Sequence, residues 1–395
     1  MKLLVVVPSL GAVYGGPSKS VIELAQALGK SGINVDLVST NANGRDVIDE
    51  PIRTWIQRDN YRVQVFPCKV IGDYKLSFPI TQWLFKNVKN YDLVQTNAIF
   101  SVPNLPAYLA CRWNNIPYVV IPRGMLEPWA LSYKAGKKKI YYNLFEKPAL
   151  QKASALQMLA STEAQQIQPL NLKSPLVISP NGIHRQDFET LPASQKFYEQ
   201  FPETRGKKLI LFLGRIDPKK GIDLLAKAFG KIRPKFPNAH LVVAGPDNIG
   251  FLPTAKKYFS DNCCLDSVTF TGMLTGESKY SALAAADCYI APSYSEGFSM
   301  SVLEGMAAGL PCIITTGCNF PEAAQANAAH VVEIDANAIT DALSACLADP
   351  AAAAAMGKQA RQYIFQHYTW DQIAKNLHEV YQKILDKQPI AQYAT

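Results

Sequence analysis

The sequence predicts a doubly wound α/β protein of two domains, and three observations support that expectation. The chain has 395 residues, which is more than one ordinary hydrophobic core accommodates. Short, continuous apolar runs alternate with segments of helical periodicity, as in parallel sheets that helices cover on both faces. This series begins at Lys2 and begins again near Lys207.

The N-terminal half starts with an apolar strand, LLVVV, and a loop that contains glycines from Gly11 to Gly16. The helix expected next carries Val21, Leu24, Ala25 and Leu28 at helical spacing, and Gly32 follows its end. Further short apolar runs predict buried parallel strands. They are Val35–Ser39, Val63–Phe66, Leu93–Gln95 and Tyr118–Ile121.

The C-terminal half repeats the pattern with a strand in LILFLG, an amphipathic helix over 221–232 and a strand in HLVVAG. VTFTG, CYIAPS and PCIITT continue the series. We therefore expect two Rossmann-like domains that face each other across a cleft. The expected boundaries are 1–183 for the first domain, 184–206 for a linker rich in Pro, Gln, Glu and Thr, and 207–370 for the second domain.

Charge is distributed unevenly along the chain. Residues 1–183 hold 20 Lys and Arg against 11 Asp and Glu, a net charge of +9, whereas the remainder sums to −1. This asymmetry suggests an anionic partner such as a lipid phosphate or a bilayer surface. An ordinary solvated surface explains it equally well. No nucleic-acid partner is expected.

No segment reaches the roughly 20 apolar residues that a membrane span needs, so any membrane contact is expected to be peripheral. The apolar N-terminal run is only about six residues long before Pro8, which favours a buried strand over a signal peptide. The eight cysteines form no CxxC pair. A cytoplasmic protein with reduced cysteines is therefore expected, located on the inner face of the membrane if it contacts lipid.

A dinucleotide-dependent dehydrogenase shares the strand–glycine loop–helix start, but two details disfavour it. GAVYGG does not satisfy the GxGxxG pattern. The second strand ends at Thr40, where an acidic residue should hold the ribose.

The most informative stretch is ADCYIAPSYSEGFSMSVLEGMAAGLPCIIT, residues 286–315. A strand leads into a turn at Glu296-Gly297, and a helix starts near Ser299, so free N–H groups could receive a diphosphate. Glu296 is placed to accept hydrogen bonds from sugar hydroxyls, and Glu304 is within reach of a ribose diol. The alternatives are an ordinary turn residue for Glu296 and a capping box, Ser301-x-x-Glu304, for the second glutamate.

A second candidate site lies in LILFLGRIDPKKG, residues 209–221. Arg215 follows the end of a strand, and Lys220 precedes the next helix. Because strand carboxyl ends in open α/β sheets border the ligand crevice, these two cations could neutralise a departing diphosphate. An Arg and a Lys beside a helix are also common in purely structural roles, and Lys219 is interpreted as a solvated neighbour.

These segments together resemble family 4 of the glycosyltransferases, the retaining group 1 enzymes with the GT-B fold. Glu296 and Glu304 match the family's paired glutamates, and GRIDPKKG matches its Gly-Arg…Lys-Gly element. SPNGIH (179–184), YGGPSKSVIELAQAL and PRGMLEPWAL (122–131) are similar to further family segments. A Tyr-Thr-Trp near Trp370 and the helix expected over about 371–387 resemble the closing helix that returns to the N-terminal domain.

The resemblance implies a metal-independent hexosyltransferase without a cofactor, using a UDP or GDP sugar as donor. The implied acceptor is a saccharide or a lipid-pyrophosphate-linked saccharide, in polysaccharide or glycolipid biosynthesis. No Asp-x-Asp sequence occurs that would hold a diphosphate through a metal, so no metal site is expected. The implied catalytic residues are Arg215, Lys220 and Glu296, and the implied donor-binding residues are Gly15, Gly16, Met273, Gly297, Phe298, Ser299, Met300, Ser301 and Glu304.

The chain departs from the family at Arg123, where many members carry a histidine assigned to the donor sugar. We expect Arg123 to contact either the acceptor or the donor sugar. YDLVQTNA also lacks the family's histidines, so no catalytic role is assigned to Gln95 or Asn97. The alternatives to a retaining transferase are a sugar-nucleotide epimerase or inverting transferase of the same fold, and a non-catalytic nucleotide-sugar binding protein.

Overall fold

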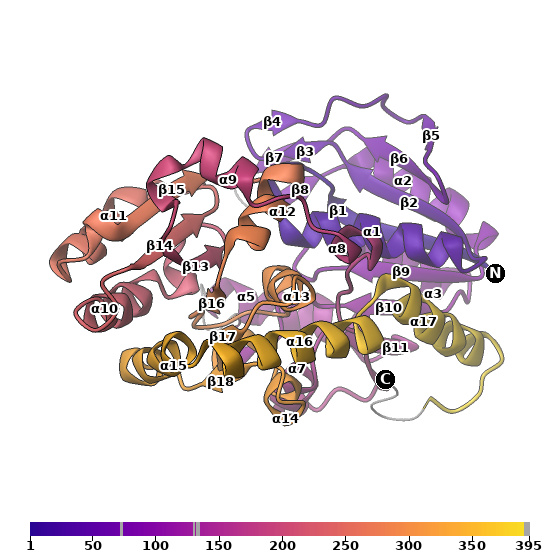
Figure 1. Cartoon of the computed structure of the whole chain (residues 1–395). Coiled ribbons are helices and arrows are strands. Elements are labelled where there is room, and N and C mark those ends of the chain that lie inside the picture. The colour runs from indigo at the N-terminus through magenta and orange to yellow at the C-terminus, as the bar shows by residue number, and fades with distance from the viewer. Residues whose placement is uncertain (72–73, 129–130, 132–134, 391–395) are drawn as a thin grey trace. The chain divides into compact units, whose positions relative to one another are not determined.

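The structure, a computed structural model, describes residues 1–71, 74–128, 131 and 135–390 (Figure 1). It divides into two compact units. Unit 1 comprises Met1–Gly182 together with the returning segment from Trp370, and unit 2 comprises Ile183–Thr369. Trp129 and Ala130 of the PRGMLEPWAL segment lie outside the described residues.

Unit 1 is built on an eight-stranded sheet of order β12-β11-β10-β9-β1-β2-β6-β5, in which only the edge strand β5 pairs antiparallel. Its strands are β1 (Lys2–Ser9), β2 (Asn34–Thr40), β5 (Trp55–Gln57), β6 (Tyr61–Phe66), β9 (Leu93–Asn97), β10 (Tyr118–Ile121), β11 (Ala155–Met158) and β12 (Leu176–Ile178). Two further antiparallel pairs form separate two-stranded sheets, β3 (Ala42–Asn43) with β4 (Asp46–Val47) and β7 (Lys69–Ile71) with β8 (Tyr74–Leu76).

The helices of unit 1 are α1 (Gly16–Lys30), α2 (Phe78–Asn87), α3 (Asn104–Trp113), α5 (Ala135–Tyr141), α6 (Lys147–Leu150), α7 (Ser161–Gln166) and α17 (Trp370–Leu385). Strand β1 is buried over Leu3–Val7 because its apolar residues face helices on both sides of the sheet. The strand order reverses between β1 and β9, which makes the carboxyl ends of these two strands a topological switch point.

The last helix, α17, belongs to unit 1 although it follows unit 2 in the sequence. It packs against α1, where the buried Trp370 donates its indole N–H to Glu23 (3.1 Å). The hydroxyl of Tyr381 donates to Gln95 Oε1 at the sheet (2.7 Å). Apolar side chains of α17 recur at helical spacing, which explains why this helix has a face to bury.

Unit 2 contains a six-stranded parallel sheet of order β15-β14-β13-β16-β17-β18, with its switch point between β13 and β16. Its strands are β13 (Lys208–Leu213), β14 (Ala239–Ala244), β15 (Val268–Gly272), β16 (Cys288–Ala291), β17 (Cys312–Thr315) and β18 (His330–Val332). Its helices are α8 (Gln186–Glu189), α9 (Gln195–Gln200), α10 (Ile222–Ile232), α11 (Leu252–Asp261), α12 (Gly276–Ala285), α13 (Met300–Ala307), α14 (Glu322–Gln325), α15 (Ala336–Ala348) and α16 (Pro350–His367).

The segment 184–206 differs from the linker that the sequence predicts. It is part of unit 2, where it forms α8 and α9. Phe188 and Phe197 within it are buried, and Phe188 packs edge-on against Tyr280 of α12. Buried aromatic rings fasten this largely polar segment to unit 2, and Phe197 also packs against Phe201 within the segment.

Within the residues that the structure describes, no helix is both long enough and apolar enough to span a bilayer.

Candidate functional site

The switch point of unit 2 brings together two of the predicted residues. Lys220 follows β13 and Glu296 follows β16, the strands between which the order reverses. Lys220 Nζ lies 2.5 Å from Glu296 Oε1, and both side chains are 14% exposed. Ligands of open α/β sheets bind at such a point, outside the carboxyl ends of the strands. The pair therefore marks the candidate donor site.

The carboxylate of Glu296 is held in its charged form. Burial alone would raise the pKa of Glu296, but the ammonium of Lys220, the hydroxyl of Ser293 and the charge of Lys219 together lower it. Ser293 Oγ donates to Glu296 Oε1 at 2.7 Å. The backbone of Glu296 is fixed as well, because its N–H donates to Gly317 O after β17 (2.7 Å). A fixed, ionised carboxylate is suited to accept hydrogen bonds from sugar hydroxyls.

Lys220 is positioned by a short turn before α10. Asp217 caps this turn by accepting from the N–H of Lys219 (2.9 Å), and Gly221 ends it with φ +67°. A Cβ at Gly221 would lie 1.9 Å from Pro292 O, so glycine is required for the loop after β13 to approach the loop after β16. The same contact keeps Lys220 beside Glu296.

The second glutamate, Glu304, lies on α13 and is buried. Lys279 Nζ of α12 donates to Glu304 Oε1 at 2.8 Å. Ser299, not Ser301, is the N-cap of α13, so the capping-box alternative is wrong. Instead, Ser301 Oγ accepts from Tyr289 OH (2.9 Å). Lys279 was not predictable as part of the site, because a single lysine on a helical stretch gives no sign in the sequence of the residue it pairs with.

The other predicted residues of unit 2 lie on loops at the same edge of the sheet. Met273 follows β15 and is 61% exposed. Arg215 follows β13 and is exposed, and it makes no side-chain hydrogen bond or ion pair to any described residue. Gly297 and Ser299 lead into α13, whose first residue is Met300 and whose N-cap, Ser299, makes no side-chain cap bond. The ring of Phe298 is buried against Phe320 and Tyr368, so a donor would meet the backbone of this residue.

Gly15, Gly16 and Arg123 lie in unit 1, also at carboxyl ends of strands. Gly15 is the N-cap of α1 with φ +67°, and a Cβ at Gly15 or Gly16 would meet no atom within 4 Å. Space is therefore open around the start of α1. Arg123 follows β10 and bonds to Asn97 and Ser20.

Two buried carboxyl groups of unit 1 escaped the sequence interpretation. Glu146 is 2% exposed and accepts from the N–H of Phe100 (2.7 Å), and burial raises its pKa to about 7. Glu163 is fully buried and accepts from the N–H groups of Leu159 and Gly124 (both 2.7 Å), and burial likewise raises its pKa to about 7. A single glutamate in a helical stretch gives no sign in the sequence that its carboxyl group is buried.

Raising the pH from about 5 to about 8 is expected to destabilise unit 1. Because folding raises the pKa of Glu146 and Glu163 from 4.5 to about 7, the folded state carries more protons between these values. The contribution of these two carboxyl groups to stability is therefore greatest below pH 4.5 and is lost as the pH rises through about 7, by on the order of 1–3 kcal/mol per carboxyl. All five tryptophans of the sequence belong to unit 1, so Trp fluorescence during urea unfolding measures this effect.

The matched variants are Glu146→Gln and Asp49→Asn. Glu146→Gln keeps an oxygen that accepts from Phe100 N, but its side chain cannot ionise. The slope of the unfolding free energy against pH should therefore decrease by the equivalent of about one proton. The second changes an exposed carboxyl group and should leave the slope as in the wild type. An unchanged slope in Glu146→Gln contradicts the prediction.

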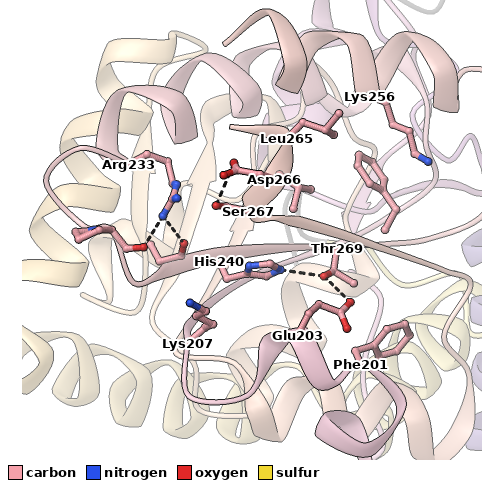
Figure 2. Close-up of a pocket in the computed structure, with 14 residues that line it drawn as sticks. Phe201, Glu203, Lys207, Arg233, His240, Lys256, Leu265, Asp266, Ser267 and Thr269 are labelled. Atoms are coloured by element: carbon pink, nitrogen blue, oxygen red, sulfur yellow. Dashed lines mark hydrogen bonds between the residues drawn. The ribbon is translucent and has the colours of Figure 1, made fainter. Parts of the chain in front are cut away.

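A cavity of about 730 Å³ lies elsewhere in unit 2 (Figure 2). Its lining includes Lys207 just before β13, His240 near the start of β14 and Thr269 near the start of β15. Thr269 donates to Glu203 Oε1 and lies 2.9 Å from His240 Nε2. The cavity is thus at the amino ends of the strands, the edge opposite Lys220 and Glu296, and none of the predicted site residues lines it.

Among the described residues, no group of three or more His, Cys, Asp and Glu side chains could hold a metal ion. Independence of metal stays a prediction.

Comparison with known proteins matches each half of the chain to a family. Residues 14–187 match the model for Glycosyltransferase Family 4, and residues 194–363 match that for Glycosyl transferases group 1. The GDP-mannose-dependent α-(1-6)-phosphatidylinositol monomannoside mannosyltransferase of Mycobacterium tuberculosis is 30% identical over 208 residues, which are 50% of this chain and 53% of that protein. The chain thus spans about half the length of this relative.

Solved structures resemble the whole chain. Sucrose-phosphate synthase from Thermosynechococcus elongatus superposes with a TM-score of 0.77 at 20% identity, covering 98% of this chain and 100% of that one. HepE from Anabaena, in complex with UDP and glucose, superposes with a TM-score of 0.76 at 17% identity, covering 97% and 100%. At these identities the likeness shows a shared fold.

Proposed function

Because this chain belongs to the family 4, group 1 glycosyltransferases and has their GT-B fold of two Rossmann-like domains, we propose that it is a retaining hexosyltransferase. It would move a sugar from a nucleotide diphosphate to a saccharide or lipid-linked saccharide, in polysaccharide or glycolipid biosynthesis. The observation that carries this proposal is the Lys220–Glu296 pair at the switch point of unit 2, next to the start of α13.

The donor would be held by groups that suit its parts. Its diphosphate would meet Lys220, Arg215 and the N–H groups at the start of α13, where the helix dipole favours negative charge. Glu296 would accept from sugar hydroxyls, and Glu304 from the ribose diol. Lys220 and Lys279 form ion pairs with these two carboxylates, so donor binding would exchange part of each ion pair for contacts to substrate.

Transfer would occur on the face of the sugar from which the diphosphate leaves. The acceptor oxygen forms a bond to the anomeric carbon while the bond from that carbon to the phosphate oxygen breaks, and the departing phosphate takes the acceptor's proton. Retention usually suggests a carboxylate nucleophile, but Glu296 is tied to Lys220 and Ser293 and is better suited to bind hydroxyls. The protein then supplies positioning and charge stabilisation.

The donor base is proposed to be uracil or guanine. The mycobacterial relative uses GDP-mannose by its name, and HepE was solved with UDP. The acceptor of that relative is a phosphatidylinositol monomannoside, which agrees in kind with a lipid-linked saccharide. No metal ion is required in this scheme, because cations of the protein meet the diphosphate.

A thermal-shift screen in EDTA with GDP, UDP, ADP and their common sugar conjugates tests the proposal. A ligand at about 100 times its Kd stabilises the fold by roughly 2.7 kcal/mol, which gives a measurable shift. Stabilisation by one nucleoside diphosphate without metal, with the sugar conjugate then consumed and the anomeric configuration kept, supports it. Inversion of the anomeric configuration would show an inverting transferase, and epimerisation of the sugar would show an epimerase. Binding without turnover would show a non-catalytic nucleotide-sugar binding protein.

A peripheral contact with anionic membranes is proposed for unit 1. Ile140 and Leu144 are each 64% exposed and Phe145 is 43% exposed, on α5 and the π-helical turn after it. Lys139 beside them is exposed as well, and the N-terminal half carries the excess of positive charge. Exposed apolar side chains beside cations suit a bilayer surface of negative charge.

Sedimentation with phosphatidylglycerol vesicles is expected to carry the protein down at low salt and to fail as salt rises. Leu144→Ser should weaken this binding several-fold, since it removes one of the three exposed apolar side chains, Ile140, Leu144 and Phe145. Trp113→Ser, at an 82% exposed position on α3, is the matched control and should bind as the wild type. Absence of binding at low salt contradicts the proposal.

A further inference from the structure

The turn that carries Arg123 is held in a strained conformation. Arg123 and Gly124 both lie in the left-handed region, with φ of +56° and +74°. This conformation costs a residue with a Cβ about 1–2 kcal/mol. Glu163 fixes the turn, because one carboxylate oxygen accepts from Gly124 N and the other from Leu159 N. Strain that the surrounding structure maintains is typical of functional positions.

The fixed turn places the guanidinium of Arg123 against two neutral side chains. Its Nε and Nη2 atoms donate to Asn97 Oδ1 at 3.0 and 2.8 Å, and Nη1 donates to Ser20 Oγ at 2.8 Å. Ser20 Oγ in turn donates to Pro17 O in the first turn of α1 (3.2 Å). These bonds use three of the five guanidinium N–H groups. The remaining two have no partner among the residues that the structure describes.

The charge of Arg123 is incompletely balanced. No described carboxylate lies within 4.0 Å of it, whereas Arg62 in the same unit pairs with the buried Asp36 through two N–H groups. Glu163 is near enough to influence Arg123, but its pKa near 7 leaves it partly protonated at neutral pH. Burial lowers the pKa of Arg123 to about 10, so the group stays a cation whose desolvation is not repaid by an ion pair.

The position of Arg123 is that of a ligand site. Asn97 ends β9 and Arg123 follows β10, at the carboxyl edge of the unit 1 sheet beside its switch point. The loop after Asn97 is also strained and fixed: Ala98 and Phe100 have φ of +66° and +54°. Asn104 donates to Ala98 O (2.7 Å), and Glu146 accepts from Phe100 N. Rigid support from two loops suits recognition of a planar or tetrahedral anion.

We infer that Arg123, oriented by Asn97 and Ser20, binds an oxyanion group of the acceptor, either a phosphate or a carboxylate. This inference rests on the proposed function, in which the donor diphosphate is met by Lys220, Arg215 and α13 in unit 2. The two unused N–H groups and the unbalanced charge of Arg123 are then satisfied by the acceptor. A phosphate would come from a lipid-linked acceptor, and a carboxylate from an acidic sugar.

The test uses the whole 395-residue chain with Lys220→Ala, which weakens the proposed anion site of unit 2. Binding of inorganic phosphate and of malonate is measured by calorimetry at low ionic strength. One of the two probes should bind, and adding Arg123→Asn should weaken that binding at least tenfold. Asparagine tolerates the left-handed conformation, so the turn is kept. Arg112→Gln, which removes an exposed charge on α3, is the control and should bind as its parent.

Each outcome decides a separate point. Preferential binding of phosphate assigns a lipid phosphate, and preferential binding of malonate assigns an acidic sugar. The inference is overturned if the Lys220→Ala protein binds the probe equally tightly with and without Arg123→Asn, or if it binds neither phosphate nor malonate. Loss of nucleotide binding in the Arg123→Asn single variant would place the donor diphosphate at Arg123 and overturn it as well. If Arg123→Asn fails to fold, Arg123→Gly, which accepts φ +56° without strain, replaces it. Failure of the nucleotide screen in the wild type would instead refute the proposed function.

Discussion

Lys220→Ala is expected to slow release of nucleoside diphosphate from the sugar donor by about 100-fold or more, and to weaken nucleotide binding. Lys220 lies 2.5 Å from Glu296 at the proposed donor site, where its ammonium would meet the leaving diphosphate. Loss of this ammonium therefore removes charge stabilisation of the leaving group. It also leaves the Glu296 carboxylate buried without its main partner, and the pKa of Glu296 should then rise. The rate is measured with the sugar nucleotide that the thermal-shift screen identifies.

Lys219→Ala is the matched control. Lys219 is the adjacent lysine, and its charge also lowers the pKa of Glu296, whereas Lys220 donates a hydrogen bond to that carboxylate. A severalfold loss at most is expected from Lys219→Ala. Equal losses in the two variants would mean that the general positive potential of this loop matters and that the Lys220–Glu296 contact does not.

Gly221→Ala is expected to destabilise unit 2 by more than about 3 kcal/mol. The added Cβ would lie 1.9 Å from Pro292 O, and that atom belongs to backbone that cannot move without displacing the loop after β16. The left-handed φ of +67° adds strain of about 1 kcal/mol. Thermal unfolding followed by circular dichroism should show a transition at lower temperature, and nucleotide binding should be lost with it.

Gly250→Ala separates the steric clash of the added Cβ from the strain of a positive φ. Gly250 also has a positive φ, +75°, but its Cβ would meet no atom within 4 Å. This variant should therefore lose only about 1 kcal/mol. Trp fluorescence, which reads unit 1, should be unchanged in both variants. Similar stability of Gly221→Ala and Gly250→Ala would show that the loops after β13 and β16 are not packed as described.

The fold was predictable because its signals are local and repeated. Apolar runs such as Leu3–Val7 and Leu209–Leu213 are buried in parallel strands, as their continuous hydrophobicity indicates. The boundary of unit 2 was not predictable from composition, since Phe188 and Phe197 fasten a polar stretch to it. A single buried ring outweighs several polar neighbours in the energy of packing.

The candidate site was predictable only in part, for a related reason. Lys220 and Glu296 each follow a strand, and strand ends meet at one edge of a parallel sheet. Lys279 lies inside a helix, and its pairing with Glu304 depends on how α12 packs against its neighbours. Glu146 and Glu163 are similar, because their burial follows from tertiary packing that no spacing along the chain reveals.

The return of α17 to unit 1 has a consequence for the order of events during synthesis on the ribosome. All residues of unit 2 emerge before α17 does, so this domain can finish folding while unit 1 still lacks its last helix. Until then Gln95 and Glu23 have no Tyr381 or Trp370 to accept from, and the apolar surface that α17 covers stays open. During translation, unit 1 is thus the domain that exposes apolar surface for longer, and we expect chaperones to bind it there.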